Sequence, residues 1–373
     1  MKVLSVVGAR PQFVKAAAVS RILRRAHTEV LVHTGQHYDD AMSAAFFRDL
    51  EIPLPDVNLE VGSGSHAAMT AAILGRLEPV VLAERPDAIL LYGDTNSTLA
   101  AAVVGCKVAY PGGDRPWLIH VEAGLRSFNA AMPEERNRIV ADHLSDLLLA
   151  PTATAVQHLA DEGLGERTRL VGDVMVDSHE WALRAGEERL PDVARQHPGY
   201  VLLTLHRAEN VDDPALLRAW LEAVAVARPI IFPVHPRTAA AMVAAGIELP
   251  DGFEVIEPAG YLEMVALEQA ARAVITDSGG VQKEAYLSGV PCITLRGETE
   301  WVETVDAGWN RLVEPSADEI RAALDDQEFM GRRRPRPPIF GDGHAAERVV
   351  AALEQMQTRM AAPQALAEEV SVT

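Results

Sequence analysis

The chain has 373 residues, of which 48% are hydrophobic and 23% are charged, and its formal net charge is −19. This length allows two domains of ordinary size, and the composition is typical of a globular protein rather than a disordered or membrane-embedded one. The acidic charge opposes binding to nucleic acid or to an anionic membrane surface. Cys106 and Cys292 lie in apolar contexts without metal-ligand spacing, so we expect a reduced, cytoplasmic protein.

Strands and helices alternate along the first half of the chain. Apolar runs predict strands at Lys2–Val7, Val30–Thr34, Ala88–Tyr92, Trp117–Val121 and Leu147–Ala150. Helical spacing predicts helices at Gln12–Arg25, Met42–Asp49, His66–Glu84, Leu99–Ala109 and Pro133–Ser145. This alternation indicates βαβ units around a parallel sheet.

The second half repeats the pattern, with strands expected at Tyr200–Thr204, Pro229–Val234, Phe253–Ile256, Ala271–Ile275 and Cys292–Leu295. We therefore expect an α/β protein with two Rossmann-like domains facing a central cleft. The first domain covers residues 1–173 and the second covers residues 174–343. A last helix follows at 344–360, and residues 361–373 are expected to form a disordered tail.

The turn that begins at Thr276 has the features of a phosphate site. Ser278 stands where a helix N-cap would, and Gly279 and Gly280 follow it without side chains that could block a ligand. Unpaired backbone N–H groups and the helix dipole favour an anion at such a helix start. Glu284 lies deeper in the helix, where it could accept hydrogen bonds from ribose hydroxyls. The alternative is an ordinary strand-to-helix turn with a serine cap.

Nearly every predicted strand ends in a turn with a polar side chain. These side chains are Arg10, His37, Asp94, Glu122, His206, His235, Ser278 and Arg296. Ligands of open α/β sheets bind outside the carboxyl ends of the strands, so these turns predict a ligand site.

Four positions are candidates for proton transfer: Asp94, Glu122, the pair Glu134 and Glu135, and His206. Each also has a structural explanation, since Asp94 could cap a helix and either glutamate of the pair could favour the helix dipole.

The candidate cations for an anionic ligand are Arg10, Lys15, Arg207 and Arg296, although most single arginines are solvated surface residues. No HExxH or paired-cysteine spacing predicts a metal site, and no GxSxG sequence predicts a serine hydrolase.

An ordered set of motifs covers nearly the whole chain to about Glu314. The motifs are Gly8-Ala9-Arg10-Pro11, Thr34-Gly35-Gln36-His37, Gly93-Asp94-Thr95, His120-Val121-Glu122-Ala123-Gly124-Leu125-Arg126, Pro133-Glu134-Glu135-Arg136-Asn137-Arg138, His206-Arg207-Ala208-Glu209-Asn210 and Asp277-Ser278-Gly279-Gly280. Together they resemble the non-hydrolysing UDP-N-acetylglucosamine 2-epimerases. The resemblance implies two domains around a deep cleft, as in GT-B glycosyltransferases, a homodimer, and a last helix that crosses back to the first domain.

The resemblance also implies a reaction, inversion at C2 of a UDP-linked 2-acetamido sugar without a metal or other cofactor. UDP is eliminated to give a 2-acetamidoglucal and is then added back, with the proton delivered to the other face. By the same resemblance, Asp94, Glu122, Glu134 and His206 are the catalytic residues. The implied substrate-binding residues are Arg10, Lys15, His235, Ser278, Gly279, Gly280, Glu284 and Arg296.

Some positions depart from the usual motifs of the family. Ala208 stands where a second arginine is usual, and Ser65-His66 replaces a Gly-Gln pair, so we expect altered activation by a second substrate molecule. Four further segments resemble a branch that includes UDP-2,3-diacetamido-glucuronate 2-epimerases: Arg126-Ser127-Phe128-Asn129, Val171-Gly172-Asp173-Val174-Met175, Lys283-Glu284-Ala285-Tyr286 and Glu300-Trp301-Val302-Glu303 to Gly308-Trp309-Asn310-Arg311. The sugar of such an enzyme carries an extra carboxylate, which would require a cation such as Arg126 or Arg136. A hydrolysing 2-epimerase, a GT-B glycosyltransferase and a non-enzymatic UDP-sugar-binding protein are the alternatives.

Overall fold

The computed structural model describes residues 1–35, 52–186, 188–331 and 336–370. The chain divides into two compact units: unit 1 comprises Met1–Ser178 and Phe340–Thr373, and unit 2 comprises His179–Ile339. His37 and the helix expected at Met42–Asp49 lie outside the described residues.

Unit 1 is built on a parallel sheet of seven strands in the order β3-β2-β1-β4-β5-β6-β7. The strands are β1 (Lys2–Val7), β2 (Thr28–His33), β3 (Val57–Asn58), β4 (Ala88–Tyr92), β5 (Trp117–Val121), β6 (Leu147–Ala150) and β7 (Thr168–Leu170). The register of the interior strand β1 pairs Val3 with Glu29 of β2 on one side and with Ala88 of β4 on the other. Strands β4 and β6 are buried at every position, as expected for a sheet that helices cover on both faces.

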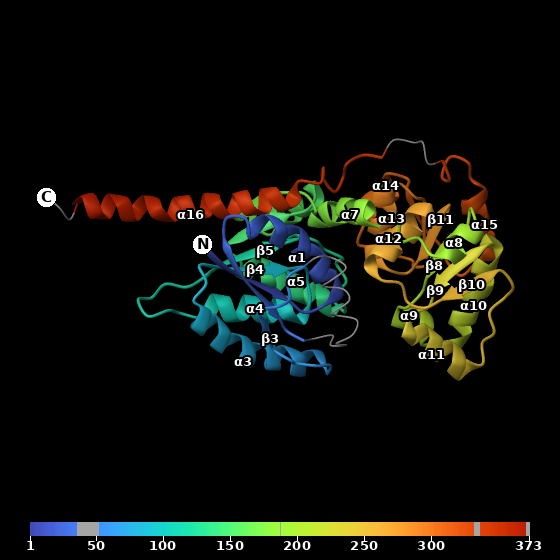
Figure 1. Cartoon of the computed structure of the whole chain (residues 1–373), viewed down its shortest axis with the longest axis horizontal. Helices are drawn as coiled ribbons and strands as arrows, with labels where there is room; N and C mark the ends of the chain where they lie inside the picture. Colours follow the sequence, from blue (N-terminus) through green and yellow to red (C-terminus); the bar gives the residue numbers. More distant parts are fainter. Residues whose placement is uncertain (36–51, 187, 332–335, 371–373) are drawn as a thin grey trace. The chain divides into compact units, whose positions relative to one another are not determined.

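Helices cover the first sheet (Figure 1). The helices of unit 1 are α1 (Arg10–Leu23), α3 (His66–Glu84), α4 (Asn96–Lys107), α5 (Pro133–Leu144), α6 (Ala153–Asp161), the 3-10 turn Gly165–Arg167 and α16 (Ala345–Val370). Helix α7 (Val174–Ala185) begins in unit 1 and continues past Ser178 into unit 2. One core packs Ile73, Leu77 and Val81 of α3 with strand residues such as Leu4 and Ile89. This packing fixes the strand ends from which the site residues project.

Unit 2 contains a second parallel sheet, of six strands in the order β10-β9-β8-β11-β12-β13. The strands are β8 (Val201–Thr204), β9 (Ile230–Pro233), β10 (Phe253–Ile256), β11 (Ala273–Thr276), β12 (Cys292–Thr294) and β13 (Asn310–Leu312). Its helices are α8 (Asp192–Gln196), α9 (Ala208–Val211), α10 (Pro214–Val224), the 3-10 turn Ala225–Ala227, α11 (Pro236–Ala245), α12 (Tyr261–Ala270), α13 (Gly279–Ser288), α14 (Val302–Asp306) and α15 (Ala317–Asp325). The predicted α/β class with two parallel sheets is therefore confirmed.

The first strand-to-helix turn of unit 1 packs closely against its neighbours. A Cβ atom on Gly8 would lie 2.1 Å from Ser97 Oγ and 2.3 Å from Thr34 Oγ1, so only glycine fits here. Gln12 accepts a hydrogen bond from the Gly8 N–H at 2.7 Å and donates one to the Tyr92 carbonyl at 2.6 Å. These contacts tie the carboxyl end of β1 to that of β4.

The last helix belongs to unit 1, where α16 packs on α1. The carboxylate of Asp177 accepts hydrogen bonds from the backbone N–H groups of Ala345 and Ala346 at 3.1 and 3.0 Å, which satisfies two donors at the helix start. The helix continues to Val370, beyond its predicted end at Met360. The disordered tail expected at 361–373 stays a prediction from the sequence.

No helix within the described residues is both long enough and apolar enough to cross a membrane.

We predict that Leu353→Ala on α16 lowers the free energy of unfolding by about 2–5 kcal/mol, because Leu353 is fully buried and its loss leaves a cavity. Gln355→Ala, at an exposed position of the same helix, should have little effect. Urea unfolding of the two variants measures the difference. Equal losses would mean that α16 does not contribute to the core of unit 1.

Candidate functional site

Each sheet has one point at which the chain reverses its direction of strand addition. In unit 1 this point lies between β1 and β4, and in unit 2 it lies between β8 and β11. Ligands of open parallel sheets bind outside the carboxyl ends of the strands at such a switch point. The predicted residues Asp94 and Glu122 follow β4 and β5, and His206 and Ser278 follow β8 and β11.

A buried ion pair lies at the switch point of unit 1. The Lys15 ammonium on α1 contacts the Glu122 carboxylate, and both side chains are almost completely buried. Gly93 has a left-handed backbone with φ of 60°, and a Cβ atom there would lie 3.2 Å from Lys15 Nζ and 3.3 Å from Glu122 Oε2. Glu122 also has a positive φ of 72°, an uncommon conformation for a residue with a side chain.

Asp94 pairs with a second buried cation. Arg138 on α5 contacts the Asp94 carboxylate and forms a 2.8 Å ion pair with Glu135. Asn137 donates a hydrogen bond to the Asp94 carbonyl at 2.9 Å. Helix α5 therefore fixes both the backbone and the side chain of Asp94.

The two glutamates that open α5 differ in their surroundings. Glu135 is buried and accepts hydrogen bonds from the backbone N–H groups of Ser127 at 3.0 Å and Phe128 at 2.9 Å. Burial opposes the ionised form, but these donors and Arg138 outweigh it and lower the pKa of Glu135. Glu135 thus fastens the preceding loop. Glu134 is half-buried, and its carboxylate has no hydrogen-bond or ion-pair partner among the described residues.

A second layer of buried charge lies behind these carboxylates. Asp142 on α5 contacts the ring of His120 at 2.7 Å and the Arg126 guanidinium at 2.7 Å, and it accepts from the Gly124 N–H at 3.1 Å. Burial would raise the pKa of Asp142, but the positive groups of His120 and Arg126 lower it. Arg126 also pairs with Glu162 at 2.7 Å.

The two arginines considered for an extra sugar carboxylate, Arg126 and Arg136, differ in their exposure and in their carboxylate partners. The side chain of Arg126 is 1% exposed and committed to two carboxylates. Arg136 is exposed, and its Nε donates only to the Ala130 carbonyl at 3.2 Å among the interactions that the described residues show. Arg10 begins α1, but its side chain lies outside the described part of the structure.

His206 is oriented by a buried aspartate of unit 2. Asp277 Oδ1 lies 3.1 Å from His206 Nδ1, and the same carboxylate accepts from the backbone N–H groups of His206 and Arg207 at 3.0 and 2.9 Å. Asn210 adds a donor at 3.2 Å. Burial would raise the pKa of Asp277, but the hydrogen bond and charge of His206 together with the backbone donors lower it. With a proton on Nδ1, the ring presents Nε2 to a ligand.

The glycine-rich turn contains Gly279 and Gly280, whose missing side chains leave space for different groups. Ser278 caps α13, since its side chain accepts from the Val281 N–H. A Cβ atom on Gly279 would lie 2.0 Å from Glu300 Oε1, so the absence of a side chain at this position makes room for Glu300. At Gly280 a Cβ atom would meet only Ser278 Oγ at 3.8 Å, which leaves the approach to the helix start open.

Glu300 also organises the cations of unit 2. Its carboxylate lies 3.0 Å from Arg296 and 3.6 Å from Arg207. Burial would raise the pKa of Glu300, but the charges of both arginines and a backbone donor lower it. Glu300 therefore holds both guanidiniums beside the start of α13.

Glu284 on α13 faces another carboxyl group on the neighbouring helix. Glu268 of α12 is fully buried, and its oxygens receive no hydrogen bond from an N–H or O–H donor of the described residues. Burial, followed by the charge and hydrogen bond of Glu284, raises the pKa of Glu268 well above its usual value. The raised pKa favours the protonated form of Glu268 beside Glu284.

Three further predicted positions have local structural partners. His235 caps α11 by accepting from the Arg237 N–H at 3.2 Å, and its ring centroid lies 5.4 Å from that of His206. Ser65 caps α3, and His66 Nδ1 lies 3.3 Å from Asn96 Oδ1.

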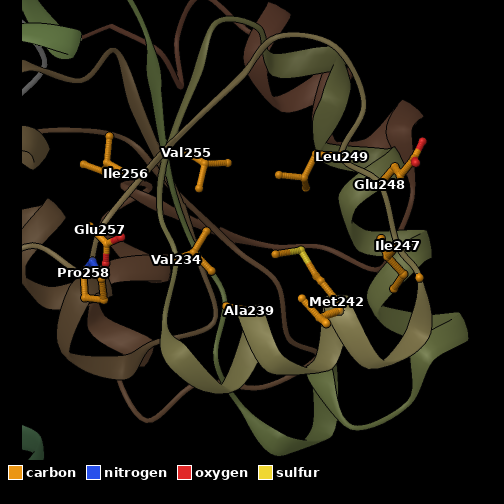
Figure 2. Close-up of a pocket in the computed structure, with 12 residues that line it drawn as sticks. Val234, Ala239, Met242, Ile247, Glu248, Leu249, Val255, Ile256, Glu257 and Pro258 are labelled. Atoms are coloured by element: carbon orange, nitrogen blue, oxygen red, sulfur yellow. The ribbon is translucent and has the colours of Figure 1, made fainter.

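An apolar pocket of about 660 Å³ lies elsewhere in unit 2 (Figure 2). In Figure 2, Val234, Met242, Leu249 and Val255 border the space between α11 and the end of β10. The lining includes no cation and none of the predicted site residues. A diphosphate therefore has no partner there.

Unit 1 thus brings together Lys15, Asp94 and Glu122, and unit 2 brings together His206, His235, Arg296 and the Ser278 turn. The residues that support them have no role predicted from the sequence. They are Gln12, His120, Arg138, Asp142, Glu268, Asp277 and Glu300. The spacing of Glu135 and Arg138, three residues apart on one helix, was a usable signal for that pair. The others are paired through the tertiary fold.

The two parallel sheets define an α/β protein with the two-domain GT-B-like fold. The sequence profile of the family described as UDP-N-acetylglucosamine 2-epimerase matches residues 21–354. The chain belongs to this family, whose members are isomerases.

Several relatives cover almost the whole chain. A UDP-N-acetylglucosamine 2-epimerase homolog of Methanococcus maripaludis is 44% identical, over 95% of this chain and 100% of the relative. The UDP-2,3-diacetamido-2,3-dideoxy-D-glucuronate 2-epimerase of Pseudomonas aeruginosa is 43% identical, with the same two coverages. The crystal structure of Methanocaldococcus jannaschii UDP-GlcNAc 2-epimerase in complex with UDP-GlcNAc and UDP is similar with a TM-score of 0.84 and 38% identity, over 95% of this chain and 100% of that one.

The Glu268–Glu284 pair predicts a pH effect on stability. Because the pKa of Glu268 is higher in the folded chain than in the unfolded chain, folding takes up a proton as the pH rises above about 4.3, and the free energy of unfolding falls. Glu268→Gln removes this titration. Relative to wild type, the variant should gain stability between about pH 5 and pH 8, by up to about 1.4 kcal/mol per pH unit.

Melting temperatures across this pH range measure the effect. Glu263→Gln, half-buried on the same helix, is the matched control. Parallel pH profiles for wild type and Glu268→Gln would contradict the raised pKa.

Proposed function

We propose that the protein inverts C2 of a UDP-linked 2-acetamido sugar without hydrolysing it. The observation that carries this proposal is the pair of carboxylates, Asp94 and Glu122, at the switch point of unit 1, each beside its own buried cation. Proton removal and return at one carbon require carboxylates held in fixed positions. The names of the relatives support the same reaction class.

In the proposed reaction, a carboxylate takes the proton from C2 while the bond between C1 and the UDP oxygen breaks. The electron pair of the C2–H bond forms the C1–C2 double bond of a 2-acetamidoglucal, and UDP leaves with the bonding pair of the C1–O bond. The UDP oxygen then adds back to C1, and a carboxylic acid delivers a proton to the opposite face of C2. Asp94, Glu122 and Glu134 are the groups proposed for these transfers.

The C2 proton is not next to a carbonyl group, so its removal depends on stabilising the departing diphosphate. We assign this role to Arg10, His206, Arg296 and the N–H groups at the Ser278-Gly279-Gly280 helix start. The bond from His206 Nδ1 to Asp277 leaves Nε2 to donate to a phosphate oxygen when the ring is protonated. Glu284 accepts from the ribose hydroxyls, and Lys15 and His235 complete the substrate contacts.

The sugar is proposed to be UDP-N-acetylglucosamine or a derivative that carries a carboxylate. The name of the Pseudomonas relative favours testing UDP-2,3-diacetamido-2,3-dideoxy-D-glucuronate. Of the two arginines considered, we propose Arg136 for the extra carboxylate, because Arg126 is already paired with Asp142 and Glu162.

A homodimer and altered activation by a second substrate molecule stay predictions from the sequence. Light scattering on the purified protein tests the first. The shape of the rate curve against UDP-N-acetylglucosamine tests the second, and a strongly sigmoidal curve would contradict it.

Proton NMR in deuterated water tests the reaction. We expect the manno isomer of UDP-N-acetylglucosamine, or of the diacetamido-glucuronate, to appear with deuterium at C2. Accumulation of free UDP and the free sugar would establish the hydrolysing alternative. Turnover that requires an added acceptor would establish a glycosyltransferase, and binding without turnover of either sugar would establish a binding protein.

We predict that Glu122→Gln lowers the turnover number by on the order of 10²- to 10⁴-fold, because the amide cannot exchange the C2 proton. Steady-state kinetics and C2 deuterium exchange measure the loss. Glu166→Gln, an exposed position in unit 1, is the matched control and should retain wild-type rates. Full turnover by Glu122→Gln would remove this carboxylate from the mechanism.

A further inference from the structure

His120 of β5 makes two contacts that together define its protonation state. Its Nδ1 lies 2.7 Å from Asp142 Oδ1, and its Nε2 lies 2.7 Å from the carbonyl oxygen of Gly93. A carbonyl oxygen only accepts hydrogen bonds, and so does an ionised carboxylate. Both ring nitrogens must therefore donate, which requires the doubly protonated, positively charged imidazolium.

The surroundings balance this charge although the ring is fully buried. Asp142, also fully buried, faces His120 and Arg126, and Arg126 in turn pairs with Glu162 on α6. The exposed His143 lies 3.2 Å from Glu162. Two buried cations thus meet two carboxylates, as buried charges require.

The imidazolium connects the two turns that present the candidate carboxylates. The Gly93 carbonyl directly precedes Asp94, and the second oxygen of Asp142 accepts from the Gly124 N–H, two residues after Glu122. Glu122 has a positive φ of 72°, which is strained for a residue with a side chain, so its turn needs contacts that hold it in this conformation.

We propose that His120 is a positioning residue that acts as an imidazolium donating from both ring nitrogens, and that it fixes the Asp94 turn relative to the Glu122 turn through Gly93 and Asp142. The residue does not touch the substrate. Its catalytic consequence rests on the proposed epimerase function, but its protonation state does not.

NMR of the wild-type protein with ¹⁵N-labelled histidine tests the protonation state directly. We expect one histidine to show both ring nitrogens protonated at neutral pH, and the signal to disappear in His120→Gln. His143→Gln, on α5 beside Glu162, should leave this signal in place and serves as the control. A neutral His120 ring, with one unprotonated nitrogen, would overturn the proposal whatever the activity of the enzyme.

Kinetics of two variants test the positioning. In His120→Gln and Asp142→Asn, we expect the turnover number to fall on the order of 10- to 100-fold while KM changes little, because the reacting groups are misplaced but the substrate contacts remain. A folded His120→Gln with wild-type turnover would overturn the positioning role. Should the wild type itself not epimerise, the proposed function fails while the NMR result still decides the state of His120.

Discussion

A buried carboxylate stays ionised only where donors surround it, and each unit of this protein contains one that organises its candidate site. Asp142 in unit 1 and Asp277 in unit 2 are both fully buried, and each contacts a histidine ring. In the adjoining strand-end turn, Asp142 accepts from one backbone N–H and Asp277 from two. In both cases the donors overcome the effect of burial and lower the pKa of the aspartate. The turns that carry Glu122 and His206 depend on these contacts for their conformation.

The two histidines are used differently because their second ring nitrogens have different surroundings. His120 is enclosed, and its Nε2 contacts the backbone carbonyl of Gly93. The side chain of His206 is 37% exposed, and its Nδ1 is the ring nitrogen that contacts Asp277. The aspartate–histidine contact of unit 1 therefore holds the backbone at Gly93, whereas that of unit 2 orients the ring of a half-exposed histidine.

Much of the fold could be predicted from the sequence because apolar runs mark the buried strands of parallel sheets. Ala88–Tyr92, Trp117–Val121 and Phe253–Ile256 have the predicted bounds, whereas the short strands β3, β7 and β13 gave no run long enough to detect. The strand-end rule also selected Asp94, Glu122, His206 and Ser278. The rule could not select Asp142 or Glu268, which lie on helices and are recognised only by their burial against partners far away in the chain. It also could not separate Glu134 from Glu135, since only the loop at Ser127 and Phe128 distinguishes them.

The discontinuity of unit 1 has a consequence for biosynthesis. Its core needs Ala345, Val349 and Leu353 of α16, which the ribosome adds only after all of unit 2 has been made. Unit 2 is one continuous segment, so its strands are all available before the first unit can be completed. During translation the surface of α1 that packs against α16 therefore stays uncovered until α16 has been made. The order in which the units fold need not follow the order in which they are synthesised.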